Sequence, residues 1–334
     1  MAVTEAAAEA IGLCRRWPNT YQAMQTLPRF SMLLPPLGTT WRLLASTVAA
    51  GMIIRHVRKP AREPVLLACH RFDPPLDAHP VVVVLLHGMW HGVWYWREVQ
   101  SYLAEQGFSS IAVDLQPASR WRGGTASELV ADLELTLTRL DIRGAALVGH
   151  SQGGLIAQAF VKDALPRHPE LLSSLVLLGT LPLGMAPTKL GLCGMGLIAY
   201  YCCMATGRIT TGAARRIFLR PGTTSTALGS TIEYIERISS APPDGLLTMT
   251  HFIPPGTHRD ESSILVLIVG AAEDDVYPPA VVKAGFDERF PHAAHFVAQG
   301  QAHCFVDPGW EEAMCAPLVA WLEGVEPRVF STGF

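Results

Sequence analysis

A serine, a histidine and a run of carboxylates carry the chemistry that this sequence offers. Ser151 lies in the pentapeptide Gly-His-Ser-Gln-Gly at residues 149–153, and it is followed by acidic residues at 273–275 and then by His303. A serine hydroxyl becomes an effective nucleophile when a base removes its proton and the chain holds it against the reacting carbon. The order serine, acid, histidine therefore predicts nucleophilic catalysis in which the acid orients the base.

The pentapeptide predicts a sharp turn between a buried strand at residues 145–148 and a helix at residues 154–162. Such a turn puts the serine side chain at its tip and crowds the backbone, so small residues are needed two positions on either side. Gly149 and Gly153 meet that need. The helix would direct its free N–H groups at the tip, where negative charge develops. An ordinary strand–turn–helix corner is the alternative interpretation, and the flanking pattern favours the catalytic one.

Apolar runs and segments with helical spacing alternate from residue 63 onward. The valine-rich run at residues 81–86 is typical of a strand that is covered on both faces. The alternation predicts a mostly parallel sheet with right-handed crossovers, in which ligands bind at the carboxyl ends of the strands. Strands are predicted at residues 64–70, 81–86, 110–115, 145–148, 174–178, 263–269 and 294–298. Helices are predicted at residues 94–106, 126–140, 154–162, 279–289 and 311–322.

Residues 181–255 interrupt this alternation. They contain an apolar patch at residues 190–204, several arginines and a segment with helical spacing at residues 231–240. We expect an inserted helical cap over the sheet. An apolar inner wall would suit an apolar substrate, although such clusters of aromatic and methionine side chains more often serve packing inside a domain.

Residues 1–62 differ from the rest of the chain because basic side chains far outnumber the acidic ones. Their longest largely apolar run, at residues 43–54, is shorter than the roughly 20 residues that span a bilayer. Three interpretations stay open. A helical extension packed on the domain is favoured over the other two, which are an amphipathic helix in peripheral contact with a membrane or over the site, and a transit segment. A cytoplasmic location is expected first, with a mitochondrion or plastid as the alternative.

Composition narrows the classes of partner. The 334 residues are 49% hydrophobic, which provides a sizeable core, and the formal net charge of −3 gives no basis for binding nucleic acid. Seven cysteines are scattered without a C-x-x-C pair or a Cys/His ligand spacing, so we expect a reducing compartment and no metal site. No cofactor is expected. The oligomeric state is left open. The expected domains are an extension at residues 1–62, a core at residues 63–180 and 256–334, and a cap at residues 181–255.

The chain from about residue 64 to its end resembles the α/β-hydrolase superfamily. The stretch His-Gly-Met-Trp-His-Gly-Val-Trp-Tyr-Trp at residues 87–96 is similar to the branch of plant methylesterases and hydroxynitrile lyases and to related bacterial esterases. The resemblance does not extend to residues 1–62 and covers the cap only loosely. It implies an α/β-hydrolase fold, with a mostly parallel central sheet, flanking helices and an inserted helical cap. The other matching motifs lie at residues 149–153, 270–274 and 300–303.

The resemblance implies a role for each member of a catalytic triad. Ser151 would be the nucleophile, and His303 would be the general base and acid. Asp274 is the first candidate for the triad acid because the family's aspartate stands four residues after a glycine that ends a strand. Asp275 is the second candidate and Glu273 the third; a carboxylate at either position would otherwise cap the following helix.

The resemblance also implies an oxyanion hole, formed by the backbone N–H groups of Met89 and Gln152. The remaining histidines receive structural interpretations: His87 braces the oxyanion loop and His150 packs. His91 could reach the pocket, but a packing role is favoured for it as well.

These residues together predict a carboxylic ester hydrolase whose substrate is a small to medium apolar ester. Two alternatives use the same fold: lyase or cofactor-free perhydrolase chemistry on the same triad, and a non-catalytic protein that binds a ligand in the pocket. Dehalogenase and epoxide hydrolase activities are disfavoured because such relatives carry an aspartate at the position of Ser151. Asp307, in the closing loop, is interpreted as a helix cap.

Overall fold

The computed structural model describes residues 63–75, 78–115, 126–183, 208–240, 264–287 and 289–325. The predicted extension at residues 1–62 and the apolar patch at residues 190–204 lie outside these ranges, so the expectations for both stay predictions. Among the described residues, no helix has the length and apolar character needed to cross a membrane.

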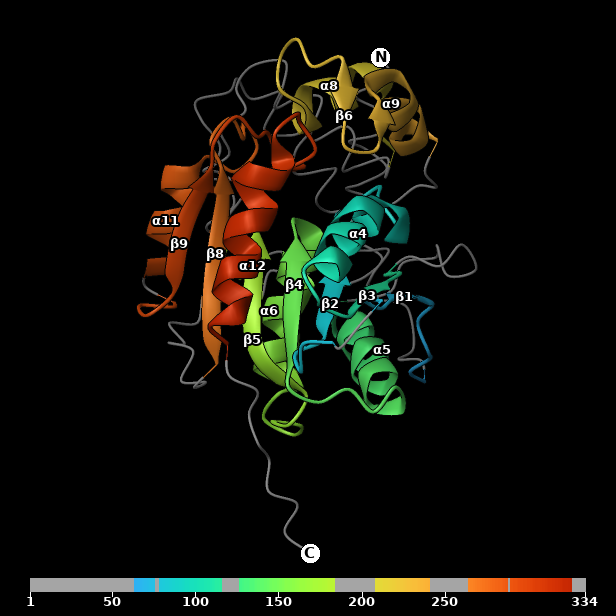
Figure 1. Cartoon of the computed structure of the whole chain (residues 1–334), viewed down its shortest axis with the longest axis vertical. Helices are drawn as coiled ribbons and strands as arrows, with labels where there is room; N and C mark the ends of the chain where they lie inside the picture. Colours follow the sequence, from blue (N-terminus) through green and yellow to red (C-terminus); the bar gives the residue numbers. More distant parts are fainter. Residues whose placement is uncertain are drawn as a thin grey trace, which may run out of the picture. The chain divides into compact units, whose positions relative to one another are not determined.

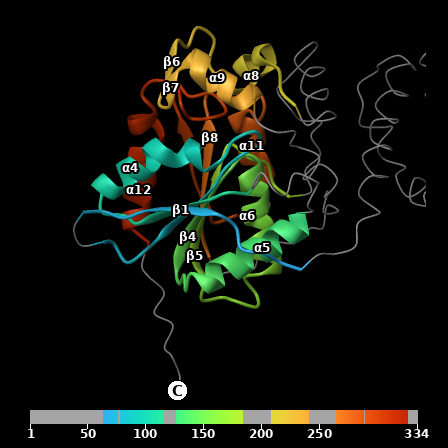
Figure 2. The same ribbon diagram turned by 90° about the vertical axis from the view of Figure 1, so that its right-hand side faces the viewer.

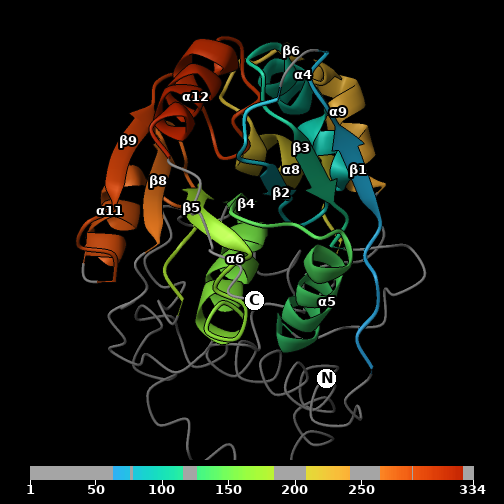
Figure 3. The ribbon, with the colours of Figure 1, turned by 60° about the horizontal axis from the view of Figure 1, so that its bottom comes forward.

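The described residues form a seven-stranded sheet in the order β1-β3-β2-β4-β5-β8-β9. Figure 3 shows these strands side by side from β9 at one edge to β1 at the other. All neighbours are parallel except β1, which runs antiparallel to β3, so the predicted mostly parallel sheet is confirmed. The bounds are β1 Cys69–Phe72, β2 Val83–Leu86, β3 Ser110–Val113, β4 Ala145–His150, β5 Leu172–Leu178, β8 Leu265–Ala271 and β9 Ala294–Ala298.

The first strand is shorter than predicted and begins later. The prediction covered residues 64–70, whereas β1 begins at Cys69. The backbone N–H of Val65 donates to Asp132 Oδ1 at 2.8 Å, and that of Leu67 donates to Thr136 Oγ1 at 2.9 Å. Because helix side chains satisfy these amides, the segment has no need of a strand partner there.

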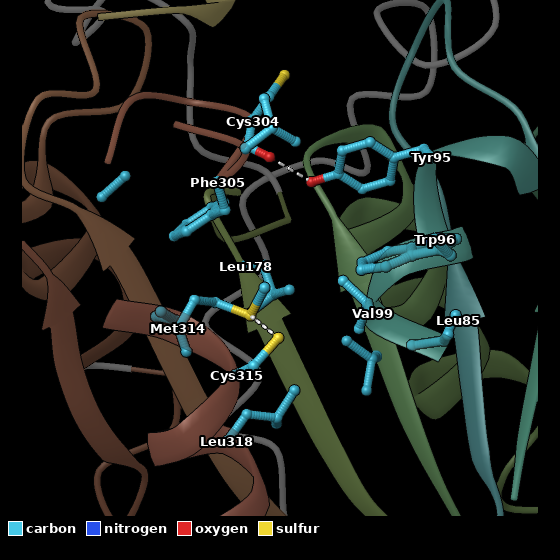
Figure 4. Close-up of a cluster of buried hydrophobic side chains, with 14 of the residues drawn as sticks. Leu85, Tyr95, Trp96, Val99, Leu178, Cys304, Phe305, Met314, Cys315 and Leu318 are labelled. Atoms are coloured by element: carbon cyan, nitrogen blue, oxygen red, sulfur yellow. Dashed lines mark hydrogen bonds between the residues drawn. The ribbon is translucent and has the colours of Figure 1, made fainter. Parts of the chain in front are cut away.

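Helices cover both faces of the sheet. Figure 2 shows α4 and α12 on one side and α5, α6 and α11 on the other. Side chains alternate along β2, so that Val83 and Leu85 belong to one apolar core while Val84 and Leu86 belong to the other. Figure 4 shows part of the first core, with Leu85 close to Trp96 and Val99. The bounds are α4 Arg97–Glu105, α5 Ala126–Arg139, α6 Gln152–Asp163, α11 Pro279–Asp287 and α12 Ala316–Glu323.

Two predicted helices contain a change of helical geometry. The predicted helix at residues 94–106 begins with a 3-10 turn, Val93–Trp96, before α4. The predicted helix at residues 311–322 begins with a π-helical turn, Glu311–Cys315, before α12. A proline lies in the first turn of α12, and its missing N–H gives a physical reason for the change in hydrogen-bond pattern there.

The described part of the predicted cap, residues 208–240, contains α8 (Thr211–Phe218), a hairpin of β6 (Ser225–Thr226) and β7 (Gly229–Ser230), and α9 (Thr231–Ser239). Figure 1 shows these elements in gold, beyond the upper ends of the strands. Helix α9 begins with a capping box in which the side chains of Ser230 and Glu233 bond each other's backbone N–H groups. The predicted domain boundaries themselves stay predictions.

Asp307 joins this inserted segment to the core, which corrects its interpretation as a helix cap. Its side chain is fully buried. Oδ1 accepts hydrogen bonds from the Thr223 hydroxyl at 2.5 Å and the Arg220 N–H at 3.3 Å, while Oδ2 accepts from the Ala302 N–H at 3.1 Å. One carboxylate therefore fixes the insert to the loop that precedes His303.

Candidate active site

Ser151 lies in a strained turn between β4 and α6. Its backbone has φ +52° and ψ −115°, and a positive φ is uncommon for a residue other than glycine. The Ser151 N–H donates to the Leu178 carbonyl at 2.9 Å, and the Thr180 hydroxyl donates to the Ser151 carbonyl at 2.7 Å. Helix α6 starts at Gln152, two residues earlier than predicted, so the helix N-terminus lies directly beside the serine.

The glycines on either side of the serine allow two backbones to approach closely. A Cβ added to Gly149 would lie 2.6 Å from the carbonyl oxygen of Gly153. A Cβ added to Gly153 would collide with the carbonyl oxygen of Leu86 at the end of β2. The steric reason for expecting small residues at these positions is therefore present in the folded chain.

We expect Gly153→Ala to lower the free energy of unfolding by about 3 kcal/mol, because the added methyl group must displace the backbone of β2. Gly212→Ala is the matched control. Gly212 lies in α8, an added Cβ meets nothing within 4 Å, and alanine is the better helix former, so that variant should be neutral or slightly more stable. Chemical denaturation measures both; equal stability of the two variants would contradict the steric argument.

Ser151, His303 and Asp274 meet at the carboxyl edge of the sheet. The distance from His303 Nε2 to Ser151 Oγ is 3.0 Å, and that from His303 Nδ1 to Asp274 Oδ2 is 2.8 Å. All three residues are buried. Because the carboxylate can only accept, Nδ1 carries the proton and Nε2 is left to accept the serine proton. Ser151 follows β4, Asp274 follows β8 and His303 follows β9, as the spacing predicts.

Asp274 is the acid that contacts the imidazole. Its second oxygen, Oδ1, accepts hydrogen bonds from the N–H groups of Val276 at 2.8 Å and Tyr277 at 2.9 Å. The two other candidates, Glu273 and Asp275, are exposed, and Glu273 lies 3.8 Å from Arg220. Burial and hydrogen bonding therefore separate Asp274 from its two acidic neighbours.

The backbone of the His303 loop is held from the opposite side of the site. His150 Nε2 donates to the carbonyl oxygen of His303 at 2.8 Å. The Tyr95 hydroxyl donates to the carbonyl oxygen of Cys304 at 2.7 Å, a bond drawn in Figure 4. Burial lowers the pKa of His150 well below its ordinary value, so its ring is neutral. His150 thus braces the histidine loop as well as packing, which goes beyond what its position in the sequence predicted.

The loop after β2 approaches the serine closely. A Cβ on Gly88 would lie 3.1 Å from the Ser151 Cβ, and Met89 follows it on the wall of the pocket. His87 braces this loop as expected: its Nδ1 donates to the Gly88 carbonyl at 2.9 Å, and its Nε2 accepts from the Leu115 N–H at 3.1 Å. The two N–H groups proposed as oxyanion donors belong to Met89 and Gln152, which directly follow Gly88 and Ser151 in the chain.

The pocket at Ser151 is narrow and mostly apolar. The space open to the centre of a water molecule is about 10 Å³, which is room for about one water. Ile217 and Phe218 from α8 form one wall, and Val276 and Tyr277 form another. His91 also lines this pocket, although the sequence favoured a packing role for it. Among the described residues, no group of three or more His, Cys, Asp or Glu side chains is arranged to hold a metal ion.

Comparisons with known proteins identify the fold. Residues 81–191 match a family model described as alpha/beta hydrolase fold. The crystal structure of the protein named putative non-heme bromoperoxidase BpoC, from Mycobacterium tuberculosis, superposes with a TM-score of 0.57 at 21% identity over 80% of this chain and 98% of that one. A thermophilic esterase from Thermogutta terrifontis gives a TM-score of 0.56 at 21% identity over 78% of this chain and 93% of that one. The chain is therefore an α/β-hydrolase-fold protein, and the predicted fold is confirmed.

Similarity in sequence covers a shorter stretch. The chain is 35% identical to BpoC over a stretch of 112 residues. This stretch covers 33% of this chain and 41% of that protein. The chain is also 34% identical over 100 residues to a protein of Mycobacterium phage D29 that is named putative non-heme haloperoxidase. This second stretch covers 29% of this chain and 34% of that protein. The chain thus spans about a third to two fifths of the length of the curated relatives that it matches.

Proposed function

We propose that this protein is a serine hydrolase that cleaves small to medium apolar carboxylic esters through an acyl-enzyme. The observation that carries the proposal is the buried chain of contacts from Asp274 through His303 to Ser151, with distances of 2.8 and 3.0 Å. An imidazole in this position can take the serine proton as the oxygen attacks, and the carboxylate stabilises the imidazolium that forms. The resemblance of residues 87–96 to esterases supports the same reaction class.

The reaction proceeds in two halves. Ser151 Oγ attacks the ester carbonyl, His303 takes its proton, and the N–H groups of Met89 and Gln152 donate to the oxygen that becomes negative. His303 then gives the proton to the departing alcohol, which leaves an acyl group on Ser151. In the second half, water attacks the acyl carbon, His303 takes a proton from it, and the carboxylic acid departs as the serine oxygen regains its proton.

The pocket sets the expected substrate class. Its apolar walls, including Ile217 and Phe218, favour an apolar group next to the carbonyl. The small free volume favours a short acyl chain, because each added methylene has to displace a wall side chain. We therefore expect kcat/KM to fall as the acyl chain lengthens from acetyl.

The test is covalent labelling with a fluorophosphonate, which reacts with an activated serine. Wild-type protein should gain one phosphonyl group on Ser151, located by peptide mass spectrometry, and should lose esterase activity in parallel. Ser151→Ala should gain none. Folded wild-type protein that neither reacts with the probe nor hydrolyses short-chain esters would refute the proposal.

A second candidate reaction is perhydrolysis on the same triad, and the names of the relatives in sequence favour it. Hydrogen peroxide would replace water in the second half, attack the acyl carbon and release a peracid together with the free serine. The discriminating measurement is the ratio of peracid to carboxylic acid formed from a short-chain ester as peroxide is raised. A hydrolase gives mainly the acid in dilute peroxide, whereas a perhydrolase gives mainly the peracid.

A further inference from the structure

His91 lies between the proposed oxyanion loop and the inserted segment. Its Nδ1 contacts the carbonyl oxygen of Met89 at 2.7 Å, and its Nε2 contacts the hydroxyl of Tyr234 in α9 at 2.9 Å. His91 is 5% exposed and Tyr234 is 1% exposed. Because a carbonyl can only accept, Nδ1 carries the ring proton and Nε2 accepts from the phenol.

Both His91 and Tyr234 are held in their neutral forms. Burial lowers the pKa of His91 to about 3, so the ring stays neutral at ordinary pH. Burial raises the pKa of Tyr234 well above its ordinary value, so the phenol keeps its proton. The two hydrogen bonds therefore keep one direction, from Tyr234 to His91 and from His91 to Met89.

The loop that His91 holds is strained. The turn is closed by a 3.3 Å hydrogen bond from the His91 N–H to the Gly88 carbonyl, and Trp90 inside it has φ +59°. A bulky residue with positive φ costs free energy, and the turn persists because surrounding contacts determine it. The His91 bond fixes the orientation of the peptide between Met89 and Trp90, and so opposes relaxation of this turn.

Helix α9 contacts the same segment in two further ways. The Arg237 guanidinium lies 4.2 Å from the centroid of the Trp94 ring, and the Tyr234 ring lies 6.1 Å from that of Trp94 in an edge-to-face arrangement. Trp94 in turn stacks on His91, with ring centroids 5.5 Å apart. These contacts join the inserted helix to the segment that directly follows the oxyanion loop.

We propose that helix α9 positions the oxyanion loop, with Tyr234 acting through His91 to hold Met89 in the geometry that the transition state needs. Tyr234 and His91 are then positioning residues for the ester hydrolysis proposed above, on which this inference rests. Two apolar rings would fill the same buried volume without polar atoms to satisfy. The polar pair instead ends on the carbonyl of the residue whose N–H is assigned to the oxyanion. In this way the placement of the insert controls the assembly of the catalytic site.

The first test is Tyr234→Phe, which removes one hydroxyl and keeps the ring. We expect kcat to fall about 10-fold with KM changed less than about twofold, because the lost contact acts on transition-state geometry. Tyr102→Phe is the matched control, since that ring packs against Trp310 and does not line the pocket, and the loss of its hydroxyl should leave both constants unchanged. Unchanged kcat in folded Tyr234→Phe would overturn the inference.

The second test separates hydrogen bonding from packing at His91. An asparagine amide lies close to the position of Nδ1 and can still donate to Met89, whereas phenylalanine keeps the ring stacking and donates nothing. We expect His91→Asn to retain at least about 10-fold more kcat than His91→Phe, although phenylalanine fills the site better. The reverse order would overturn the inference. If His91→Phe does not fold, Tyr234→Phe alone decides.

Different results would refute the hydrolase activity and the role of α9. Wild-type protein that does not react with the fluorophosphonate refutes the hydrolase itself. Wild-type protein that reacts and turns over, with Tyr234→Phe equally active, refutes the role of α9 alone. Thermal denaturation of every variant shows whether a lower kcat arises in folded protein.

Discussion

Ser151→Ala is expected to lower kcat for ester hydrolysis by about 10⁵-fold or more. The hydroxyl is the proposed site of covalent attack, and it lies 3.0 Å from His303 Nε2. The buried, strained site should fold at least as well with alanine, since a methyl group has no polar atom to desolvate. Burst and steady-state kinetics on a short-chain ester measure the loss, and thermal denaturation checks the fold.

The same variant also tests whether serine and histidine act as one unit. If they do, adding His303→Ala to Ser151→Ala should cost little further activity, because each single change already removes the covalent route. Ser225→Ala, an exposed serine in the β6 strand, is the control and should keep full activity. Independent, multiplicative losses in the double variant would contradict the shared mechanism.

Much of the fold follows from local patterns in the sequence. Apart from the first strand, alternating apolar runs and helical spacing located the strands of the sheet to within two residues at each end, and β9 has the predicted bounds. The first strand is the exception. The amides of Val65 and Leu67, inside the predicted strand but before β1, bond side chains 67 and 69 residues further along the chain, and a local pattern carries no information about such partners.

The candidate site shows the same division. Short motifs identify Ser151, Asp274 and His303, and some of the contacts that hold them are local. Asp274, for example, is fixed by N–H groups two and three residues later. Tyr234 lies 143 residues from His91, and the sequence marks it only as one residue on a predicted helix. Asp307 was assigned to capping for a related reason, because its hydroxyl partner Thr223 lies 84 residues earlier.

The sequence predicts one of the two strained turns at this site and not the other. The spacing of glycines predicts the turn at Ser151, because the close backbone contacts at Gly149 and Gly153 require residues without a side chain. Trp90 adopts a positive φ without such a signal. Its conformation depends on burial against Phe218 and on the bond that its neighbour His91 makes, both of which are tertiary.

Asp274→Asn should lower kcat by about 10⁴-fold while leaving the fold intact. The N–H groups of Val276 and Tyr277 both donate to Oδ1, so the asparagine carbonyl oxygen must take that place and its amide NH₂ must face His303. Nδ1 then has to accept, the ring proton moves to Nε2, and the imidazole can no longer take the proton of Ser151. Steady-state kinetics with Asp275→Asn as the matched control measure this effect. Asp275 is exposed, so its substitution should change kcat less than about twofold, and a loss as large as that of Asp274→Asn would place the acid elsewhere.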